Sequence, residues 1–299
     1  MRDSRRTRRA VPAACVLAGV LLGAGGCSTA PAAPTATTPP PAVRWSVIWK
    51  ADFAGPYQAA LNSSAWTYDT GQGIFGNGEI ETMTTNPGNV YLDGHGDLDI
   101  TAVGQGDSWS SGRVQTKRLF SPPAGGEMMV TASIKQPDPV GGLGYWPAFW
   151  MLGPGRWPEH GEIDIMEDAN TLDEHSGTLH CGQPCHEDTG LTSGLQPCPA
   201  CQAGYHTYRV VIDRREAGAE QIRWYLDGHQ FFSVSDAQVG AAVWAEAVDH
   251  GFSIILDVAM GGTYPDNQCQ CTAPGTGTTA GGTMSVRSLT VSDGMPASG

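Results

Sequence analysis

The sequence predicts an all-β fold, either a two-sheet sandwich or a barrel. Short alternating or apolar runs recur along the chain, with Gly, Asn, Asp or Pro between them. The chain contains 40 Gly, 21 Pro and 9 Trp, a composition typical of domains with many tight turns. A helical pattern is confined to residues 235–248. Many short strands without intervening helices favour a sandwich or barrel over an α/β fold.

The strand prediction rests on runs that combine β-branched, aromatic and aliphatic residues. These runs are residues 89–92, 97–102, 128–134, 208–212, 221–226, 230–234 and 252–256. Asp227-Gly228 separates two of them and is a strong signal for a hairpin turn. No second linker, internal repeat or block of charge interrupts residues 45–292, so we expect one domain there.

The first 44 residues predict export from a bacterial cell. An arginine-rich start precedes an apolar core at residues 11–22, which is too short for a bilayer span of about 20 residues. We therefore interpret residues 1–26 as a signal peptide. Small residues lead to Cys27 as in the bacterial lipoprotein processing box, which makes Cys27 a candidate lipid anchor. Residues 27–44, rich in Ala, Pro and Thr, predict an extended linker, and the domain would lie outside the cell or on its surface.

The net charge of −13 argues against nucleic acid or an anionic membrane as partner. It is compatible with a neutral substrate such as a polysaccharide. We expect membrane contact only through a lipid at Cys27, a monomeric state, and no cofactor.

Of the 8 cysteines, six follow the linker, at positions 181, 185, 198, 201, 269 and 271. An even number in an oxidising compartment indicates disulfides, although the sequence leaves their pairing open. The alternative is a zinc site, because the spacings 181/185 and 198/201 suit metal ligands and His180 and His186 lie adjacent. Export favours disulfides, and we predict no metal.

The stretch Gly161-Glu-Ile-Asp-Ile-Met-Glu167 alternates three carboxylates with apolar residues. On a regular strand Glu162 and Asp164 share a face, and Glu167 falls on the opposite one. A β-bulge at Ile165-Met166 would bring Glu167 to the same face. Such a strand is also typical of a solvated sheet face. Paired carboxylates across a cleft, however, are the groups that hydrolyse glycosidic bonds.

Further motifs surround the acidic strand: Gly76-Asn-Gly-Glu-Ile80, Asn89-Val90, Trp146-Pro-Ala-Phe-Trp150, Gly177-Thr-Leu-His180, His206-Thr-Tyr-Arg209, Trp224-Tyr-Leu-Asp-Gly228 and Met260-Gly-Gly262. With them the sequence resembles glycoside hydrolase family 16, the group that contains bacterial endo-β-1,3-glucanases (laminarinases). The resemblance covers nearly all of residues 45–291. It implies a β-jelly-roll sandwich of two curved antiparallel sheets with a concave substrate cleft.

The resemblance also implies a role for each acid in a retaining double displacement. Glu162 matches the nucleophile, Glu167 matches the general acid/base, and Asp164 would assist Glu162. Since like charges held close raise a pKa, we expect Asp164 to share a proton or hydrogen bond with Glu162. We expect Glu167, flanked by aromatic residues and two other acids, to be the carboxyl that stays protonated.

Aromatic side chains can bind a sugar because a pyranose ring presents an apolar C–H face. Core packing is the competing interpretation for one face of the Trp146–Trp150 strand, whereas Trp157 follows a Gly/Pro turn and suits a cleft wall. His180 would either be structural, hold a sugar hydroxyl or orient Glu167. The candidate substrate-binding residues are Trp157, Trp146, Trp150, His180, Asn89 and Glu79.

The chain departs from the family pattern at several positions. Thr131 and Ser133 stand where many members have Glu and Arg on a strand entering the cleft. Asp257 stands where members often have Asn, and Arg287 replaces an Asp that binds calcium in some members. A guanidinium at that position argues against calcium.

The leading hypothesis is an exported endo-acting glycosidase that cleaves β-1,3-linked glucan. The same acids would serve for β-galactan or mixed-linkage glucan, and water or a second sugar could accept the intermediate. A non-catalytic surface carbohydrate-binding protein on the same fold is the alternative from another class, and the intact acids disfavour it.

Overall fold

Strands are the main regular secondary structure of the domain in the computed structural model, which describes residues 42–73 and 76–297. They form two large sheets and one small sheet. The predicted signal peptide and the lipid anchor at Cys27 lie outside the described residues. None of the helices within the described chain has the length and apolarity that a bilayer crossing requires.

The first large sheet is antiparallel throughout. Its strands are β1 (Val43–Lys50), β5 (Val90–Leu92), β6 (Leu98–Thr101), β10 (Glu127–Lys135), β16 (His206–Asp213), β17 (Gln221–Leu226), β18 (His229–Ser235) and β20 (Thr283–Pro296). Their order is β18-β17-β16-β10-β20-β6-β5, and β1 also pairs with β20. Along β10 the residues alternate between fully buried Met128, Val130, Ala132 and Ile134 and half-buried neighbours, so one face of this sheet builds the core.

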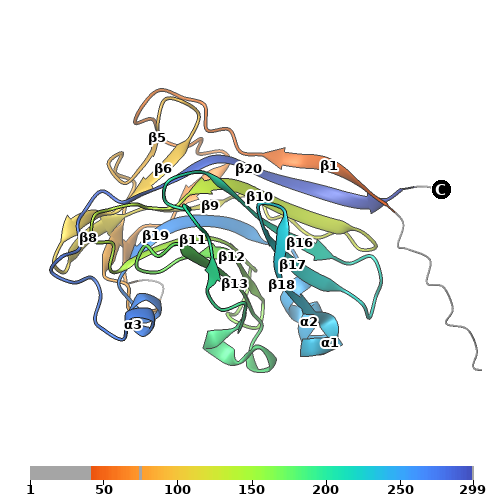
Figure 1. Ribbon diagram of the computed structural model, residues 1–299. Helices are drawn as coiled ribbons and strands as arrows, with labels where there is room; N and C mark the ends of the chain where they lie inside the picture. The colour runs from red at the N-terminus through yellow and green to blue at the C-terminus, as the bar shows by residue number, and fades with distance from the viewer. Residues whose placement is uncertain (1–41, 74–75, 298–299) are drawn as a thin grey trace, which may run out of the picture. The chain divides into compact units, whose positions relative to one another are not determined.

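The second large sheet, also antiparallel, carries the acidic stretch near its centre. Its strands are β2 (Trp66–Tyr68), β9 (Arg113–Thr116), β11 (Tyr145–Leu152), β12 (Glu162–Glu167), β13 (Glu174–His180), β14 (Leu191–Thr192), β15 (Gln196–Pro197) and β19 (Ser253–Met260). Their order is β14-β13-β12-β11-β19-β9-β2, with β15 paired to β13. Figure 1 shows the layer of β1, β20 and β10 above the layer of β19, β11 and β12. This sandwich confirms the predicted fold class.

A small sheet and several helices complete the described chain. The small sheet contains β3 (Gly71–Gln72), β4 (Glu81–Met83), β7 (Val103–Gln105) and β8 (Ser108–Ser111), and β4 and β8 run parallel. The α-helices are α1 (Asp236–Val239), α2 (Ala241–Val248) and α3 (Thr263–Cys269), and the 3-10 turns are η1 (Gln183–Cys185) and η2 (Glu187–Thr189). Gly240, with φ 91°, divides the single helix predicted over residues 235–248 into α1 and α2.

Most predicted local features are present. Every predicted strand run overlaps a strand, and Asp227 and Gly228 have φ values of 48° and 82° in the turn that joins β17 to β18. The predicted domain boundaries need a small correction. Strand β1 begins at Val43, inside the predicted linker, and β20 continues to Pro296, because the two strands pair from Val43 opposite Pro296.

The cysteines pair with near neighbours in the sequence. Disulfides join Cys181 to Cys185, Cys198 to Cys201 and Cys269 to Cys271. The first two lie in the segment that follows β13, as expected for staples on that loop, and the third closes the end of α3. Because Cys198 and Cys201 are bonded to each other, they offer no thiolates to the neighbouring His206 for zinc.

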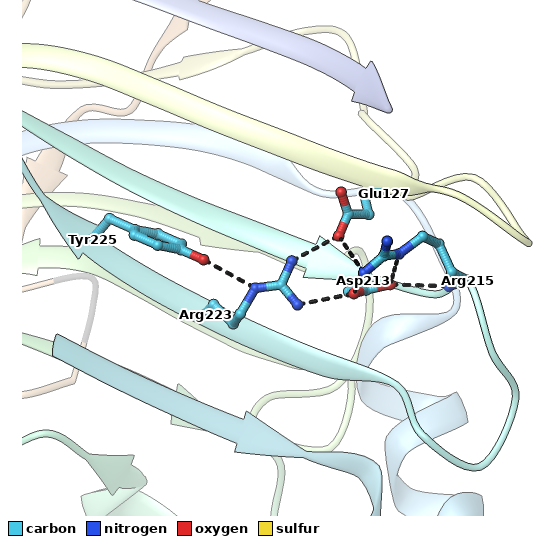
Figure 2. A network of polar contacts seen from close by, with 5 residues as sticks. All are labelled: Glu127, Asp213, Arg215, Arg223 and Tyr225. Carbon is cyan, nitrogen blue, oxygen red and sulfur yellow. Dashed lines mark hydrogen bonds and ion pairs between the residues drawn. The ribbon is translucent and has the colours of Figure 1, made fainter. Parts of the chain in front are cut away.

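An ion-pair network ties β10, β16 and β17 together at one end of the first sheet (Figure 2). Arg223 donates to Asp213 (2.9 Å) and to the buried Glu127 (2.7 Å), and its Nε donates to the Tyr225 hydroxyl (3.0 Å). Arg215 binds the same two carboxylates. Burial alone would raise the pKa of Asp213, but hydrogen bonds from the two arginines hold it well below its usual value.

Candidate active site

A β-bulge on β12 places the three acids on one face of the second sheet. Phe149 of β11 pairs with Met166 and Trp150 pairs with Asp164, so Ile165 is an extra residue on β12. The register against β13 shifts at the same place. Ile165 and Met166 are both fully buried, while Glu162, Asp164 and Glu167 line one cleft. The predicted bulge at Ile165-Met166 is confirmed.

The bulge is held from the opposite sheet. Trp224 of β17 is fully buried and its Nε1 donates a 2.7 Å hydrogen bond to the Asp164 carbonyl oxygen. On β13, Gly177 leaves space for this indole, since a Cβ there would lie 2.6 Å from Trp224 Cδ1. The sandwich therefore fixes the backbone of the acidic strand across the core.

His180, the last residue of β13, lies against the first two acids. Its Nε2 is 3.6 Å from Glu162 Oε1 and 3.2 Å from Asp164 Oδ2. The imidazole thus lies between the two carboxyls, and no direct hydrogen bond of the expected kind joins Glu162 to Asp164 in the described structure. Of the roles considered for His180, orienting Glu167 is not the one that these short contacts support, because they go to the other end of β12.

Two indoles of β11 bind carboxylates in the cleft. Trp146 Nε1 donates to Glu167 Oε1 (2.8 Å), and Trp150 Nε1 donates to Asp257 Oδ1 (2.7 Å). Phe149 and Met151, on the other face of the strand, are fully buried in the core. The competing core interpretation therefore holds for that face, and the tryptophan face lies on the cleft.

Burial controls the protonation of the acids. It raises the pKa of Glu167 to about 8, with a further rise from Asp164, against a lowering by the Trp146 hydrogen bond. Burial likewise raises the pKa of Asp164 to about 8 and that of Glu162 well above its usual value, in Glu162 with help from the charge of Asp164. Three carboxyls so close cannot all ionise near neutral pH, so the cluster retains protons. A protonated Glu167 beside an ionisable Glu162 is the combination that acid-assisted displacement requires.

The cleft runs across the strands of the second sheet, and the acids lie at its middle. One half, here called the β9 half, is lined by Asn77, Glu79, Arg113, Trp146, Ala148, Trp150, Leu152, Gly155, Trp157, Asp257 and Ala259. The other, the β13 half, is lined by Gly76, Asn77, Trp146, Trp157, Ser176, Thr178, His180, Asp188, Thr189, Thr192, Gly194, Leu195, Thr263, Tyr264, Asn267 and Gln268. Glu162, Asp164 and Glu167 line both halves. Trp157, 42% exposed, borders both halves, as a sugar platform at the cleft wall would.

The structure brings five of the six candidate substrate-binding residues to the cleft and excludes one. Asn89 is buried, and its amide donates to the carbonyl oxygens of Thr101 (3.0 Å) and Ser110 (3.1 Å). Its Oδ1 accepts from the Thr84 hydroxyl (2.8 Å). The proposal that Asn89 contacts substrate was wrong, because its carboxamide is consumed in joining backbone segments.

One of the departures from the family pattern also needs revision. Thr131 and Ser133 lie on β10 in the first sheet, where the Thr131 hydroxyl accepts from Arg209 Nε, so they do not alter the cleft. Arg287 stacks over Tyr205 (3.6 Å to the ring centroid) and pairs with Asp97 (3.4 Å).

Sequence reasoning missed Arg113 and Tyr264 and noted Asp257 only as a departure. Arg113 pairs with Asp69 (3.1 Å) and its guanidinium lies 4.5 Å from the centre of the Trp150 ring. Burial raises the pKa of Asp257 to about 6, with Arg113 opposing the rise. An arginine in an alternating strand run, Arg113-Val-Gln-Thr116, was the available signal.

Glu162, Asp164 and His180 are also the described cluster with metal-ligand spacing in the cleft, since one donor atom from each lies within 4.8 Å of the others. Two carboxylates and one imidazole are a reasonable donor set for a divalent cation. In this structure His180 Nε2 lies 3.6 Å from Glu162 Oε1 and 3.2 Å from Asp164 Oδ2, so the three donor groups contact one another directly.

A two-sheet sandwich with clustered carboxyls in an aromatic-lined cleft defines a glycosidase-type carbohydrate-active domain. The model of an XgeA-like, catalytic GH16 domain matches residues 95–206. The endo-1,3-β-glucanase structure from Streptomyces sioyaensis is 39% identical with a TM-score of 0.80, and the match covers 87% of this chain and 100% of that one. The endo-β-1,3-glucanase structure from Pyrococcus furiosus is 30% identical with a TM-score of 0.68, over 85% of this chain and 96% of that one.

Among curated proteins, glucan endo-1,3-beta-glucosidase A1 of Niallia circulans is 30% identical over 76% of this chain. The match spans only 35% of that relative's length. Taken with the structural matches, these similarities show that the chain belongs to glycoside hydrolase family 16, a family of retaining glycosidases, and that it is endo-1,3-β-glucanase-like.

Proposed function

We propose that the protein is an exported endo-acting glycoside hydrolase that cleaves β-1,3-linked glucan with retention of configuration. The observation that carries the proposal is the bulged strand β12, which presents Glu162, Asp164 and Glu167 to one aromatic-lined cleft. A cleft that continues on both sides of the acids suits cleavage within a chain. The relatives named as endo-1,3-β-glucanases support the choice of linkage.

In the first step the Glu162 carboxylate attacks the anomeric carbon of the sugar bound at the acids. The bond from that carbon to the glycosidic oxygen breaks, and Glu167 gives its proton to the leaving oxygen. In the second step Glu167, now a carboxylate, takes a proton from water as the water oxygen attacks the same carbon and releases Glu162. His180, which also contacts Asp164, lies against the Glu162 carboxyl and positions it, while the charge of Asp164 acts on Glu162 electrostatically.

The test compares Glu162→Gln, Glu167→Ala and the control Glu246→Gln, which changes an acid of α2 outside the cleft. Glu162→Gln should abolish laminarin cleavage and retain polysaccharide binding. Glu167→Ala should lose about 10²- to 10⁴-fold on laminarin and much less on aryl glycosides with good leaving groups. Normal turnover by Glu162→Gln, or equal losses of Glu167→Ala on both substrates, would contradict these roles.

Substrate choice and the fate of the intermediate are tested by product analysis on laminarin, lichenan, galactan and agarose. Preference for laminarin with release of β-anomers supports the proposal. Preference for galactan or lichenan would move the assignment to β-galactan or mixed-linkage glucan. Longer transfer products would identify a transglycosylase.

We also propose that the protein is exported and held at the cell surface by a lipid on Cys27. The support is the arginine-rich start, the short apolar core and the small residues before Cys27. In cell fractionation, Cys27→Ala should move the protein from the membrane fraction to the medium. A protein that stays in the cytoplasm or in the medium regardless of Cys27 would contradict this.

A further inference from the structure

The β13 half of the cleft is a half-open hollow with a defined lining. It has a volume of about 630 Å³, within the range of about 300–1,000 Å³ that ligand sites occupy. It extends from the acids over β13 and β14 to helix α3. Each of its two walls is flanked by a short disulfide.

The first wall is the segment after His180. Directly after β13, the disulfide Cys181–Cys185 closes a short ring. The chain then returns as β14, which pairs with Thr178 and Leu179 of β13. Gly190, with φ 65°, permits this return, because a Cβ there would lie 2.4 Å from Thr178 Cγ2 and 3.1 Å from His180 Cε1. The wall is therefore packed directly against the histidine that contacts the nucleophile. It presents Asp188, Thr189, Thr192, Gly194 and Leu195 to the cavity.

The second wall is helix α3, anchored at both ends. Asn170 Nδ2 donates to the Pro265 carbonyl oxygen (3.0 Å), and the Tyr264 hydroxyl lies 3.1 Å from Ser176 Oγ. Beyond the helix, Asp266 Oδ1 accepts from the Ala273 backbone N–H (2.7 Å), and Cys269–Cys271 closes the end. The helix presents Tyr264 and the exposed amides Asn267 and Gln268 to the cavity.

The lining is rich in hydroxyls and amides. Ser176 and Thr178 form the floor, and among the described residues of this lining Asp188 is the only carboxylate besides the central acids. No lysine or arginine occurs among the described residues that line this half. Amides and hydroxyls both donate and accept, which matches neutral sugar hydroxyls, whereas a sulfate or uronate would meet carboxylates without a compensating cation.

We propose that the segment 188–195 and helix α3 form a two-walled polar subsite that binds uncharged glucosyl units beyond the cleavage point and excludes anionic polysaccharides. This rests on the proposed glycosidase function. The subsite lengthens the substrate that the protein recognises and supplies specificity that the central acids cannot, since they act only on the scissile linkage.

The test uses the double variant Asn267→Ala/Gln268→Ala and the control Gln183→Ala. Gln183 is an exposed amide inside the Cys181–Cys185 ring, ahead of the first wall, and it does not line the cavity. On a ladder of β-1,3-gluco-oligosaccharides, kcat/KM of the double variant should fall about tenfold for long oligosaccharides, as expected for two lost neutral hydrogen bonds. For the shortest cleaved oligosaccharide the loss should be below about twofold, and the control should match the wild type at every length.

A charge test uses Gln268→Lys, with neutral and sulfated laminarin as probes. The wild type should have a higher kcat/KM for neutral than for sulfated laminarin, and Gln268→Lys should reduce the ratio of these two values. Equal losses at all lengths, no loss at any length, or a wild type that cleaves both polymers equally would overturn the proposed subsite.

Binding separates this inference from the proposed function. In a Glu162→Gln background, calorimetry with a neutral β-1,3-glucohexaose should show about tenfold weaker binding for the double variant. If the double variant weakens binding but the wild-type protein cleaves no glucan, the hydrolase proposal alone is overturned. If the wild-type protein cleaves glucan but the double variant binds the hexaose as tightly as its Glu162→Gln background, the subsite alone is overturned.

Discussion

The hydrogen bond from Trp146 to Glu167 offers a direct test of how the cleft controls its general acid. Burial raises the pKa of Glu167 to about 8, and the Trp146 indole opposes that rise. A hydrogen bond to a charged group contributes about 1.5–3 kcal/mol and one to a neutral group about 0.5–1.5 kcal/mol. The indole therefore favours the anion by about 1.4 kcal/mol, which corresponds to about one pKa unit.

Replacing Trp146 with Phe removes the donor and keeps an aromatic ring. The Glu167 anion loses stabilisation, so the proton is held to higher pH. In a pH profile of kcat/KM, the alkaline limb reports the acid of the free enzyme, and we expect it to move up by about one unit. The height of the profile will also fall, because a smaller ring binds sugar less well, but that loss does not depend on pH.

The matched control is Trp150→Phe, the same chemical change on the same strand. Its indole donates to Asp257, so its loss keeps Asp257 protonated to higher pH and reduces negative charge near Glu167. The alkaline limb should then stay in place or move slightly down. An unmoved or lowered limb in Trp146→Phe, or an equal rise in both variants, would refute the reasoning.

Three further outcomes follow from the packing and the charges. Trp224→Phe deprives the Asp164 carbonyl oxygen of its donor, which should cost about 2 kcal/mol in urea unfolding and lower kcat; wild-type stability would contradict this. Arg223→Met leaves the buried Glu127 with one cation fewer, which should cost about 3 kcal/mol while activity per folded molecule is unchanged, and a lower kcat would be unexpected. Glu167 binds a proton in the folded protein between pH 4.5 and about 8 that the unfolded chain has released, so wild-type stability falls as pH rises through this range. Gln cannot titrate, and the melting temperature of Glu167→Gln should therefore decline less between pH 5 and 8; parallel declines would refute the assigned pKa.

Sequence patterns predicted the strands and the arrangement of the acids because both follow from local periodicity. Three apolar residues of this strand must be buried while the acids beside them face the cleft: Ile163, Ile165 and Met166. A strand with a bulge satisfies both requirements, whereas a regular strand does not. The face of β11 followed from the same alternation. Residue alternation was thus enough to predict any feature that depends on a single strand.

Features that depend on contacts between distant segments were beyond such patterns. Asn89 matches a motif, but its role was set by carbonyl oxygens 12 and 21 residues away. Helix α3 has seven residues with Pro265 among them and is held by Asn170 and Ser176, so its own sequence carries little helical signal. That His180 lies on the strand next to the acidic one follows from chain order, but the register that sets it opposite Glu162 depends on contacts between β12 and β13.

The disulfides have a consequence for how this protein can vary. Each joins residues only four, three or two positions apart, so each closes a very small ring. Cross-links of that size remove little freedom from the unfolded chain, and the sandwich gains little global stability from them. Cys181, Cys185, Cys198 and Cys201 are buried in the hydrophobic core, so their two bridges act as local braces that hold the loop after β13 onto the sandwich. Variation of this loop is therefore confined to exposed residues between the buried sulfur pairs, such as Asp188 and Thr189, while the reaction centre beneath stays the same.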